Sequence, residues 1–408
     1  MVNPLPIHLQ YLQELLHPVS DFTDSPVVLI FSVDPTFSGL ARLPKTLKES
    51  GFEVIALCSP KAFLAKTRYL NHRLPISNTK SSIRLLQQLS DAIDCYRPSF
   101  LILGDEMTVA LVHHVIQNLE RFQKKLPDST LKFIQSSLGD PQYFEATLLK
   151  HRTLELAQKL GLRVPAMASV TQAAEAQEFA EKIGYPIVLK KDFGCSGVGV
   201  EICRNEAEFL TILPSFLPRP QSSFKTIVRK QLQRDWFPQE KTLSLQQYVQ
   251  GKTAMYPVVA VDGEILASFA AIKEETCSET GPSSVIHLVN HAEMQATATA
   301  LIQKFHYTGF ASFDFLIQDK TQHAYLLECN PRPVPVCHLG ALGGVNLAQA
   351  LFAHISGQHW EPQTRIKQEE TIALFPQEWK RNPTSPNLSK FYHDVPWDDP
   401  ELLKAYVG

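Results

Sequence analysis

Two acidic residues lie in a segment that reads as a β-hairpin. Residues 311–330 contain two strand-like runs joined by a short polar turn. If Ile317 pairs near Tyr325, then Asp314 falls directly opposite Glu328 on the neighbouring strand. Carboxylates that oppose each other across a strand pair repel and destabilise the sheet. The pairing therefore indicates that something positive lies between them.

Asn330 belongs to the same set, because side chains two residues apart share one face of a strand. Asp314, Glu328 and Asn330 together offer only oxygen ligands on the protein side, a set that suits Mg²⁺ or Mn²⁺, usually shared with substrate phosphates. The alternative is a solvated hairpin that carries two surface acids.

A second group of candidate residues follows the apolar run that begins at Tyr185. The run delivers Lys190 and then a loop that contains Gly194, Gly197 and Gly199. Glycines let backbone N–H groups approach phosphate oxygens, and a lysine adds positive charge. The spacing matches neither a Walker A motif nor a dinucleotide-binding turn. A plain turn after a solvated lysine is the alternative.

The elements that position these residues start with alternating strands and helices. The pattern predicts strands at 27–31, 52–57 and 100–103 and helices at 6–17, 40–50 and 81–96. Continuous apolar strands between helices are typical of a parallel sheet covered on both faces. Asp105 and Glu106 follow the third strand, where open α/β sheets place ligands. Exposed loop acids are the alternative for both.

The pattern changes after residue 140. It predicts helices at 143–160, 172–183 and 345–355, a strand at 186–191, a surface loop over 213–239, mainly strands from 244 to 328, and a tail from 361 that lies across the body and ends in an amphipathic piece at 400–406. We expect an α/β and α+β protein with a doubly wound parallel-sheet domain first. The expected divisions are 1–140, 141–250, 251–360 and 361–408.

Composition narrows the class of protein. The chain has 408 residues, 44% of them hydrophobic, and 39 basic and 41 acidic residues leave a net charge of −2. This balance gives no support for a nucleic-acid or membrane partner. The seven cysteines are scattered and form no CxxC pair, which is typical of a reduced compartment. We expect a cytoplasmic protein.

Taken together, the motifs resemble the ATP-grasp superfamily, in which two α+β subdomains clamp ATP. The resemblance covers about residues 140–357 and implies a site for ATP and Mg²⁺ (or Mn²⁺). It implies phosphate contacts from Lys150, Lys190 and the loop of Gly194, Gly197 and Gly199. It implies metal ligation by Asp314, Glu328 and Asn330.

The same resemblance implies roles for three further parts of the chain. Residues 246–251 match the hinge whose backbone recognises adenine, through Gln247, Tyr248 and Val249. Arg332 matches the arginine that steadies the transferred phosphate or a substrate oxyanion. Lys273 is the candidate for a contact with the γ-phosphate, and an exposed lysine is its alternative.

The sequence also departs from the family's pattern. The hinge usually carries an acidic residue, but positions 246, 247 and 250 are glutamines, and Thr253 stands where a glutamate is common. Biotin carboxylases continue past the asparagine with an acid, whereas the run from Arg332 to Gly340 has none. The resemblance is therefore to ligases that join a small carboxylate to an amine.

The implied activity is an ADP-forming ligase in which a substrate carboxylate attacks the γ-phosphate and an amine displaces phosphate from the acyl phosphate. The segment 391–403 is also similar to the mycosporine glycine-adding ligase type, which activates an enolic oxygen, and this chemistry stays open. A regulator that binds ATP without turnover is a third reading. The expected partners are a small carboxylate (or enol) and an amine, with a homodimer as the commonest closed assembly.

Overall fold

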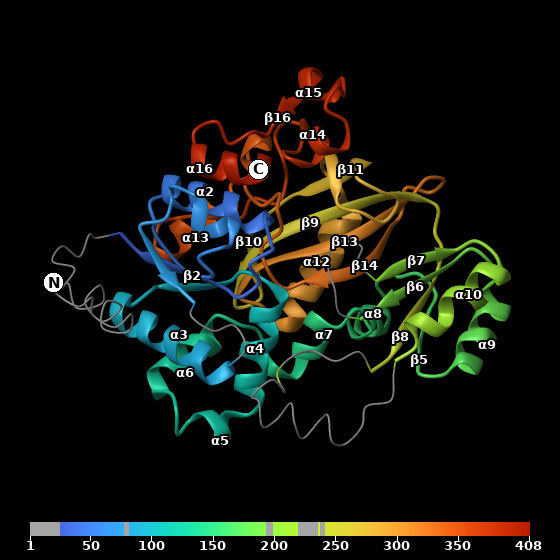
Figure 1. The fold of residues 1–408 in the computed structure, drawn as a ribbon, viewed down its shortest axis with the longest axis horizontal. Coiled ribbons are helices and arrows are strands. Elements are labelled where there is room, and N and C mark those ends of the chain that lie inside the picture. The colour runs from blue at the N-terminus through green and yellow to red at the C-terminus, as the bar shows by residue number, and fades with distance from the viewer. Residues whose placement is uncertain (1–24, 77–80, 193–198, 219–235, 237–240) are drawn as a thin grey trace, which may run out of the picture.

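The computed structural model describes residues 25–76, 81–192, 199–218, 236 and 241–408. Three sheets organise this part of the chain, and helices pack between and around them (Figure 1). The predicted helix at 6–17, together with Gly194 and Gly197, lies outside the described residues. The predicted mixed α/β and α+β class is confirmed.

The N-terminal sheet is parallel, with strand order β3-β2-β1-β4. Its strands are β1 (Val27–Ser32), β2 (Glu53–Cys58), β3 (His72–Pro75) and β4 (Phe100–Leu103). The three predicted strands are confirmed to within one residue. The sequence pattern missed β3, an edge strand in which only Leu74 is buried, because a strand with one buried side chain gives no apolar run.

Helices cover this sheet on both faces, as a doubly wound domain requires. They are α2 (Leu43–Ser50), α3 (Ser82–Tyr96), α4 (Glu106–Gln117), α5 (Leu119–Phe122) and α6 (Asp128–Ser136). The predicted helix at 40–50 opens with a 3-10 turn, Gly39–Arg42, and ends where Gly51 adopts φ 113°. The left-handed conformation at Gly51 is open to glycine without steric cost.

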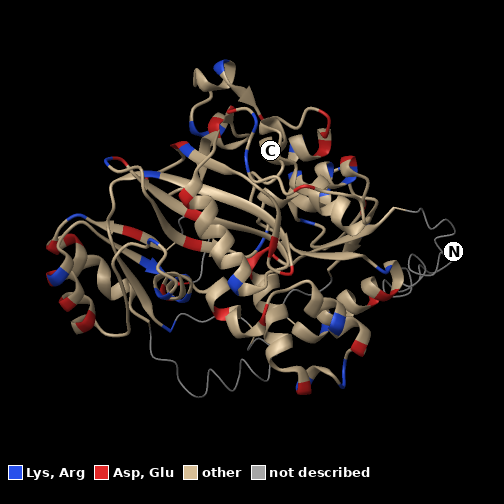
Figure 2. Ribbon diagram, turned by 180° about the vertical axis from the view of Figure 1, so that it is seen from behind, with Lys and Arg blue, Asp and Glu red and all other residues tan. Residues whose placement is uncertain are grey.

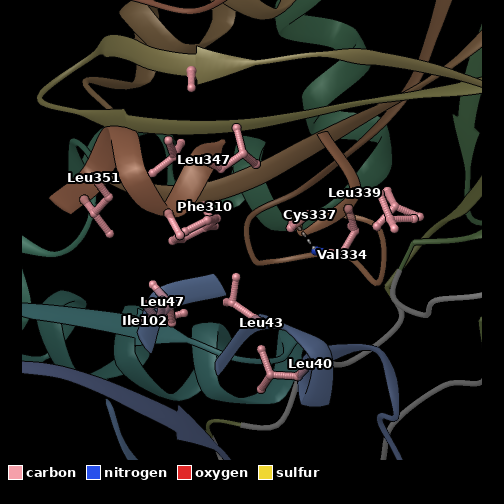
Figure 3. Packing of buried hydrophobic residues seen from close by; sticks show 14 of the residues in the cluster. Leu40, Leu43, Leu47, Ile102, Phe310, Val334, Cys337, Leu339, Leu347 and Leu351 are labelled. Carbon is pink, nitrogen blue, oxygen red and sulfur yellow. Dashed lines mark hydrogen bonds between the residues drawn. The ribbon is translucent and has the colours of Figure 1, made fainter. Parts of the chain in front are cut away.

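The two faces of the N-terminal sheet belong to different cores. Leu29 and Phe31 pack with α3 and α4, whereas Val28 and Ile30 pack in a cluster that also contains residues of the C-terminal half. Figure 3 shows this second cluster, in which Leu43 and Leu47 of α2 face Leu347 and Leu351 of α13 (Leu347–Ile355). One face of the N-terminal sheet therefore shares a hydrophobic core with the C-terminal half of the chain.

The predicted helix at 143–160 is two helices, α7 (Phe144–Leu148) and α8 (Lys150–Lys159). Leu149 between them is extended, with φ −101° and ψ 121°. The hydroxyl of Thr153 donates a hydrogen bond to the backbone carbonyl of Ala146 at 2.7 Å. This bond gives the carbonyl, which lies before the break, a hydrogen-bond donor. The break turns α8 so that Lys150 starts a helix of its own.

A second, antiparallel sheet has strand order β5-β8-β6-β7 and forms what we call the lid (Figure 1, right). Its elements are β5 (Met167–Val170), β6 (Ile187–Lys191), β7 (Val200–Cys203) and β8 (Leu243–Gln247), covered by α9 (Ala173–Ile183) and α10 (Glu206–Phe216). The helix at 172–183 and the strand at 186–191 are confirmed. The predicted loop from residue 213 is wrong at its start, because α10 continues through Pro214 and buries Leu213.

The third sheet is the largest, with order β14-β13-β9-β11-β12-β15-β16 and β10 beside β9. Its long strands are β9 (Gly251–Val261), β10 (Glu264–Ser268), β11 (Ala270–Thr276), β12 (Ser283–Val289), β13 (Gly309–Gln318) and β14 (Ala324–Asn330). Helix α12 (Ala292–Phe305) buries Met294 and Leu301 in one core cluster with Phe313 of β13. The predicted dominance of strands between 244 and 328 is confirmed.

The tail adds two strands to this sheet. Its elements are β15 (Thr371–Ala373), α14 (Gln377–Arg381), α15 (Asn387–Lys390), β16 (Tyr392–His393) and α16 (Pro400–Val407). β15 pairs with β12, and β16 pairs with β15. The expectation that the tail lies across the body holds, but the strand addition was missed because strands of three and two residues carry no readable alternation.

Buried polar contacts fasten the tail to the N-terminal domain. The carboxylate of Asp394 accepts from Arg42 at 2.7 Å and lies 2.9 Å from Nε2 of His338. Burial raises the pKa of Asp394, but the charges of His338 and Arg42 outweigh burial and hold that pKa below its usual value. The ion pair therefore contributes stability only while Asp394 is ionised.

None of the helices in the described ranges combines the length and the apolar composition needed to span a membrane. Basic and acidic residues are interspersed over the ribbon in the view of Figure 2.

We expect Asp394→Ala to lower the free energy of unfolding by about 3–5 kcal/mol, because it leaves Arg42 and His338 buried without their counter-charge. The matched control is Asp398→Ala, whose half-exposed carboxylate pairs with Lys45 at 2.6 Å and whose loss should cost less than about 1 kcal/mol. Denaturant unfolding at pH 7 measures both. Because the pKa of Asp394 is lowered, its effect should be full above about pH 4 and shrink as the pH falls through its folded pKa. Equal losses for the two variants would contradict the prediction.

Candidate functional site

The hairpin of β13 and β14 pairs the two acids as the sequence predicted. Asp314 lies opposite Glu328, and Ser312 lies opposite Asn330. The anchor of that prediction was off by one residue, because Ile317 pairs with Ala324 and not with Tyr325. A bulge after Asp314 changes the register and restores the predicted pairing at the acids.

Lysines surround the opposed carboxylates. Nζ of Lys150, at the start of α8, lies 3.0 Å from Oε2 of Glu328, and Nζ of Lys273 on β11 lies 3.4 Å from Oδ2 of Asp314. The amide of Asn330 donates to both carboxylates at 3.4 Å. Without a ligand, these groups offset the repulsion that the strand pairing imposes.

The electrostatics differ between the two acids. Burial raises the pKa of Glu328, but the charges of Lys150 and Lys190 outweigh burial and lower it to about 2. Burial raises the pKa of Asp314. The positive charge of Lys273 lowers this pKa, and the negative charge of Glu328 raises it, so that the pKa stays above its usual value. Glu328 is therefore the firmly ionised member of the pair.

Lys190 is the buried lysine of the lid, on β6. Burial lowers its pKa to about 8, and the positive charges of Lys150 and Lys273 act in the same direction, while Glu328 and Asp314 act against it. Lys150 shows the opposite outcome: burial lowers its pKa, but pairing with Glu328 outweighs burial and leaves that pKa raised. The site thus holds more positive than negative charge, as an anion-binding site does.

These groups meet at one end of a cavity of about 290 Å³ between the lid and the large sheet. Polar residues of its wall include Lys150, Lys190, Lys273, Asp314 and Glu328. Apolar side chains of the lid and of the hairpin line it as well: Val188, Val200, Ile202, Phe315, Leu316 and Leu327. A charged end beside an apolar slot suits a ligand with a flat ring and a polyanionic tail.

The connection between lid and large sheet also lines the cavity. Gln247, Tyr248 and Val249, the residues predicted to recognise adenine, are part of its wall, and so is the buried Gln246 before them. Gly199 lies directly before β7 and has φ 75°, and a Cβ there would lie 3.0 Å from the side chain of Lys191. Both facts favour glycine at this position.

Sequence reasoning missed the apolar wall of the lid and the contact across its rim. Val188 lies two residues before Lys190 on β6, so strand alternation alone could have placed the two on one face. Arg204, just after β7, pairs with Glu279 of the β11–β12 loop at 2.6 Å. This ion pair joins the lid to the large sheet, and no sequence pattern connects two exposed charges so far apart in the chain.

Arg332 lies outside the cavity wall. Its guanidinium pairs with Glu106 at the start of α4 and lies 4.5 Å from the ring centroid of Phe37. Glu106 thus contacts Arg332, one of the predicted site residues. Asp105 has a structural role instead, because its carboxylate caps α4 by accepting from the backbone N–H of Thr108 and also accepts from the hydroxyl of Ser32 at 2.8 Å.

The donor set fits a hard cation that is shared with a ligand. Two carboxylates and one side-chain amide oxygen leave coordination positions for phosphate oxygens or water. Within the described part of the chain, histidine, cysteine, aspartate and glutamate form no group of three or more able to hold a metal ion. A cation here would therefore need oxygens from the ligand.

We expect Lys190→Met to raise the free energy of unfolding at pH 7 by up to about 3 kcal/mol, because the lowered pKa means that the fold disfavours this charge. The sign follows from proton binding. Between pH 8 and 10.5, Lys190 is protonated in the unfolded chain to a greater extent than in the folded protein. The stability of wild type therefore rises with pH over this range, and its difference from the stability of the variant shrinks. Urea unfolding at pH 7 and pH 10 checks this, with the exposed Lys182→Met as control. A variant less stable than wild type at pH 7 would contradict it.

Comparison with known proteins shows what this part of the chain is similar to. Residues 150–350 match the model of the carbamoyl-phosphate synthase L chain, ATP binding domain. The chain is 24% identical over 312 residues to the carbamoyl phosphate synthase large chain of Myxococcus xanthus, covering 75% of this chain and 26% of that protein. It is 27% identical over 188 residues to the carbamoyl phosphate synthase large chain, N-terminal section, of Aquifex aeolicus, covering 45% of this chain and 31% of that protein. The chain thus spans about a quarter to a third of these relatives.

Solved structures share the fold over most of the chain. The biotin carboxylase domain dimer of 2-oxoglutarate carboxylase from Hydrogenobacter thermophilus, solved with MgADP, ADP and bicarbonate, has a TM-score of 0.59 at 17% identity, covering 85% of this chain and 73% of that one. N5-carboxyaminoimidazole synthetase from Staphylococcus aureus has a TM-score of 0.58 at 15% identity, covering 84% of this chain and 81% of that one. L-amino acid ligase from Bacillus licheniformis has a TM-score of 0.58 at 14% identity, covering 86% of this chain and 80% of that one. Residues 150–350 are therefore similar to an ATP-binding domain of the kind found in the ATP-grasp superfamily, and most of the chain shares the fold of these three structures.

Proposed function

We propose that the protein is an ADP-forming ligase that activates a small carboxylate as an acyl phosphate and joins it to an amine. The observation that carries this proposal is the convergence of three lysines and two opposed carboxylates at one end of the cavity between lid and sheet. Relatives named as carbamoyl phosphate synthase and L-amino acid ligase support the reaction class.

The charged end of the cavity would hold the triphosphate. Lys150 and Lys190 bind phosphate oxygens, and Lys273 contacts the γ-phosphate. On binding, Lys150 and Lys273 exchange their carboxylate partners for phosphates. The lysines contribute three positive charges against two carboxylates, so an anionic ligand would offset the excess positive charge.

Asp314, Glu328 and Asn330 would hold Mg²⁺ or Mn²⁺, which when bound offsets charge on the phosphates. The trio can do so because its lysine partners move to the phosphates and free the carboxylate oxygens. Asn330 must then present its amide oxygen, where it now presents its N–H₂ group. The pKa of about 2 at Glu328 keeps this ligand ionised.

The remaining residues position the substrates. The backbone of Gln247, Tyr248 and Val249 would recognise adenine, and Gly194, Gly197 and Gly199 would cover the phosphates. Arg332 would steady a substrate oxyanion, for which it must exchange Glu106. Closing of the lid excludes water, which protects an acyl phosphate from hydrolysis.

The acceptor and the assembly are part of the same proposal. Glu106 and Arg332 lie where the N-terminal sheet meets the large sheet, so a carboxylate and an amine entering there reach the charged end of the cavity. A homodimer is proposed as the assembly, since the neighbour from Hydrogenobacter thermophilus is a dimer of its domain.

The decisive experiment is substrate-dependent nucleotide turnover. The protein is incubated with Mg-ATP and pools of small acids and amines, and ADP, AMP and phosphate are quantified. ADP with phosphate in particular pools supports the ligase, and dividing those pools identifies the substrates. AMP with pyrophosphate contradicts an acyl phosphate. ADP formed only with enolic acceptors would move the chemistry to enol activation, and ATP binding without turnover in any pool would indicate a regulator.

We expect Glu328→Gln to lower kcat by at least about 100-fold while the protein stays folded, because the change removes a ligand charge at the transferred phosphate. The control is Glu264→Gln, an exposed glutamate on β10 of the same sheet, which should keep full activity. Steady-state kinetics on the pool identified above and circular dichroism of both variants check this. Full activity of Glu328→Gln would contradict the metal assignment.

A further inference from the structure

Helix α8 begins without a side-chain cap from its own N-terminal residue. The N-cap position is Leu149, whose side chain offers no acceptor to the free N–H groups of the first turn. The acceptor comes from the lid, because Oδ1 of Asp192, directly after β6, accepts the backbone N–H of His151 at 3.3 Å. Asp192 is 3% exposed. A residue of the lid therefore caps the helix that begins with Lys150.

The side chain of His151 adds a second contact between the same two residues. Its Nδ1 lies 2.8 Å from Oδ2 of Asp192, and both side chains are more than nine-tenths buried. This contact is short, although Nδ1 makes no aligned hydrogen bond with a described residue. The hydroxyl of Thr242, at the start of β8, donates to the same Oδ2 at 2.5 Å. The carboxylate of Asp192 thus contacts its own sheet on one side and α8 on the other.

This contact lies beside the two phosphate lysines and outside the cavity that they line. Lys150 precedes His151 in α8, and Lys190 precedes Asp192 by two residues. Both lysines line the proposed nucleotide cavity. His151, Asp192 and Thr242 line a different cavity of about 500 Å³. The contact therefore joins the two elements that carry the lysines without reaching the phosphates itself.

A contact of this kind is needed because Lys150 and Lys190 repel each other. Burial lowers the pKa of Lys190 to about 8, and the charge of Lys150 lowers it against the raising effect of Glu328. Glu328 holds Lys150 at 3.0 Å, but in the proposed function phosphates take that place. The cap at Asp192 persists when this exchange occurs, since it involves neither lysine.

The exposed ion pair between lid and large sheet cannot replace this contact. The side chains of Arg204 and Glu279 are both more than half exposed, and exposed pairs contribute little because water screens them. The contact of Asp192 with His151 is buried, where attraction between polar groups is stronger. It is thus the better suited of the two to fix the lid at a defined distance from α8.

We propose that Asp192 and His151 are positioning residues of the nucleotide site, because their contact holds β6 against the start of α8 and so sets the separation at which Lys190 and Lys150 both reach the phosphates. The assignment rests on the proposed function and adds to it the contact that aligns two of its lysines. Loss of the contact should therefore weaken the binding of phosphate groups and leave the binding of a nucleoside unchanged.

Titration calorimetry in Mg²⁺ with AMP-PNP, an ATP analogue that resists transfer of its γ-phosphate, and with adenosine, which has no phosphate, tests the assignment. We expect Asp192→Ala to bind AMP-PNP about 10-fold more weakly than wild type, the effect of one hydrogen bond to a charged group, and to bind adenosine equally well. Asp192→Asn keeps an acceptor for the N–H of His151 and should recover most of this loss. The control is Glu53→Ala, which removes a carboxylate 3.6 Å from His72 in the N-terminal sheet and should match wild type.

A double variant tests whether the two residues act through one contact. His151→Ala removes the ring and keeps the backbone N–H, so it should weaken AMP-PNP binding by only about 3-fold. Added to Asp192→Ala, it should cause no further loss, because the ring then has no carboxylate to contact. Losses that multiply in the double variant would overturn the shared contact.

The outcomes separate this assignment from the function on which it rests. Undiminished AMP-PNP binding by Asp192→Ala overturns the positioning role and leaves the nucleotide site intact. Equal weakening of AMP-PNP and adenosine also overturns it, since a merely structural role lowers both affinities alike. Failure of wild type to bind AMP-PNP overturns the nucleotide site itself and the assignment with it. If Asp192→Ala does not fold, the two ligands on His151→Ala and Asp192→Asn decide, with a smaller loss expected for AMP-PNP alone.

Discussion

The opposed carboxylates of Asp314 and Glu328 are the constraint on which the site depends. Two buried acids on adjacent strands cost free energy unless positive charge lies against them. The protein meets this cost with Lys150 from α8 and Lys273 from β11, brought to 3.0 Å and 3.4 Å. Because lysines are also the groups suited to bind phosphates, the ion pairs that stabilise the two carboxylates also supply the charge that an anionic ligand requires.

Three features of the fold serve that charge cluster. The break at Leu149 starts α8 at Lys150, the bulge after Asp314 keeps the two acids opposite each other, and the lid strand β6 carries Lys190 into the same space. None of them optimises local stability. A straight helix, a regular hairpin or an apolar residue at 190 would each be more stable locally, so the charge cluster, and not local stability, accounts for these three features.

The rest of the chain holds the walls of the cavity in place. Packing of α2 and α13 in one core joins the N-terminal sheet to the large sheet, and the tail adds β15 to the same sheet while Asp394 pairs with Arg42. Arg332 and Glu106 then meet across the junction. The lid is joined to the rest of the protein through the connection at 248–250, the exposed pair of Arg204 and Glu279, and the buried contact between His151 of α8 and Asp192.

The sequence by itself determined the fold class and the pairing of the two acids. Strand alternation and hairpin pairing are local, so a period of two and a turn suffice to oppose Asp314 and Glu328. Tertiary structure alone decided what depends on contacts between distant segments. The partner of Arg332 and the pairing of strand β15 leave no periodic trace in the sequence, since each follows from contacts with residues far away in the chain.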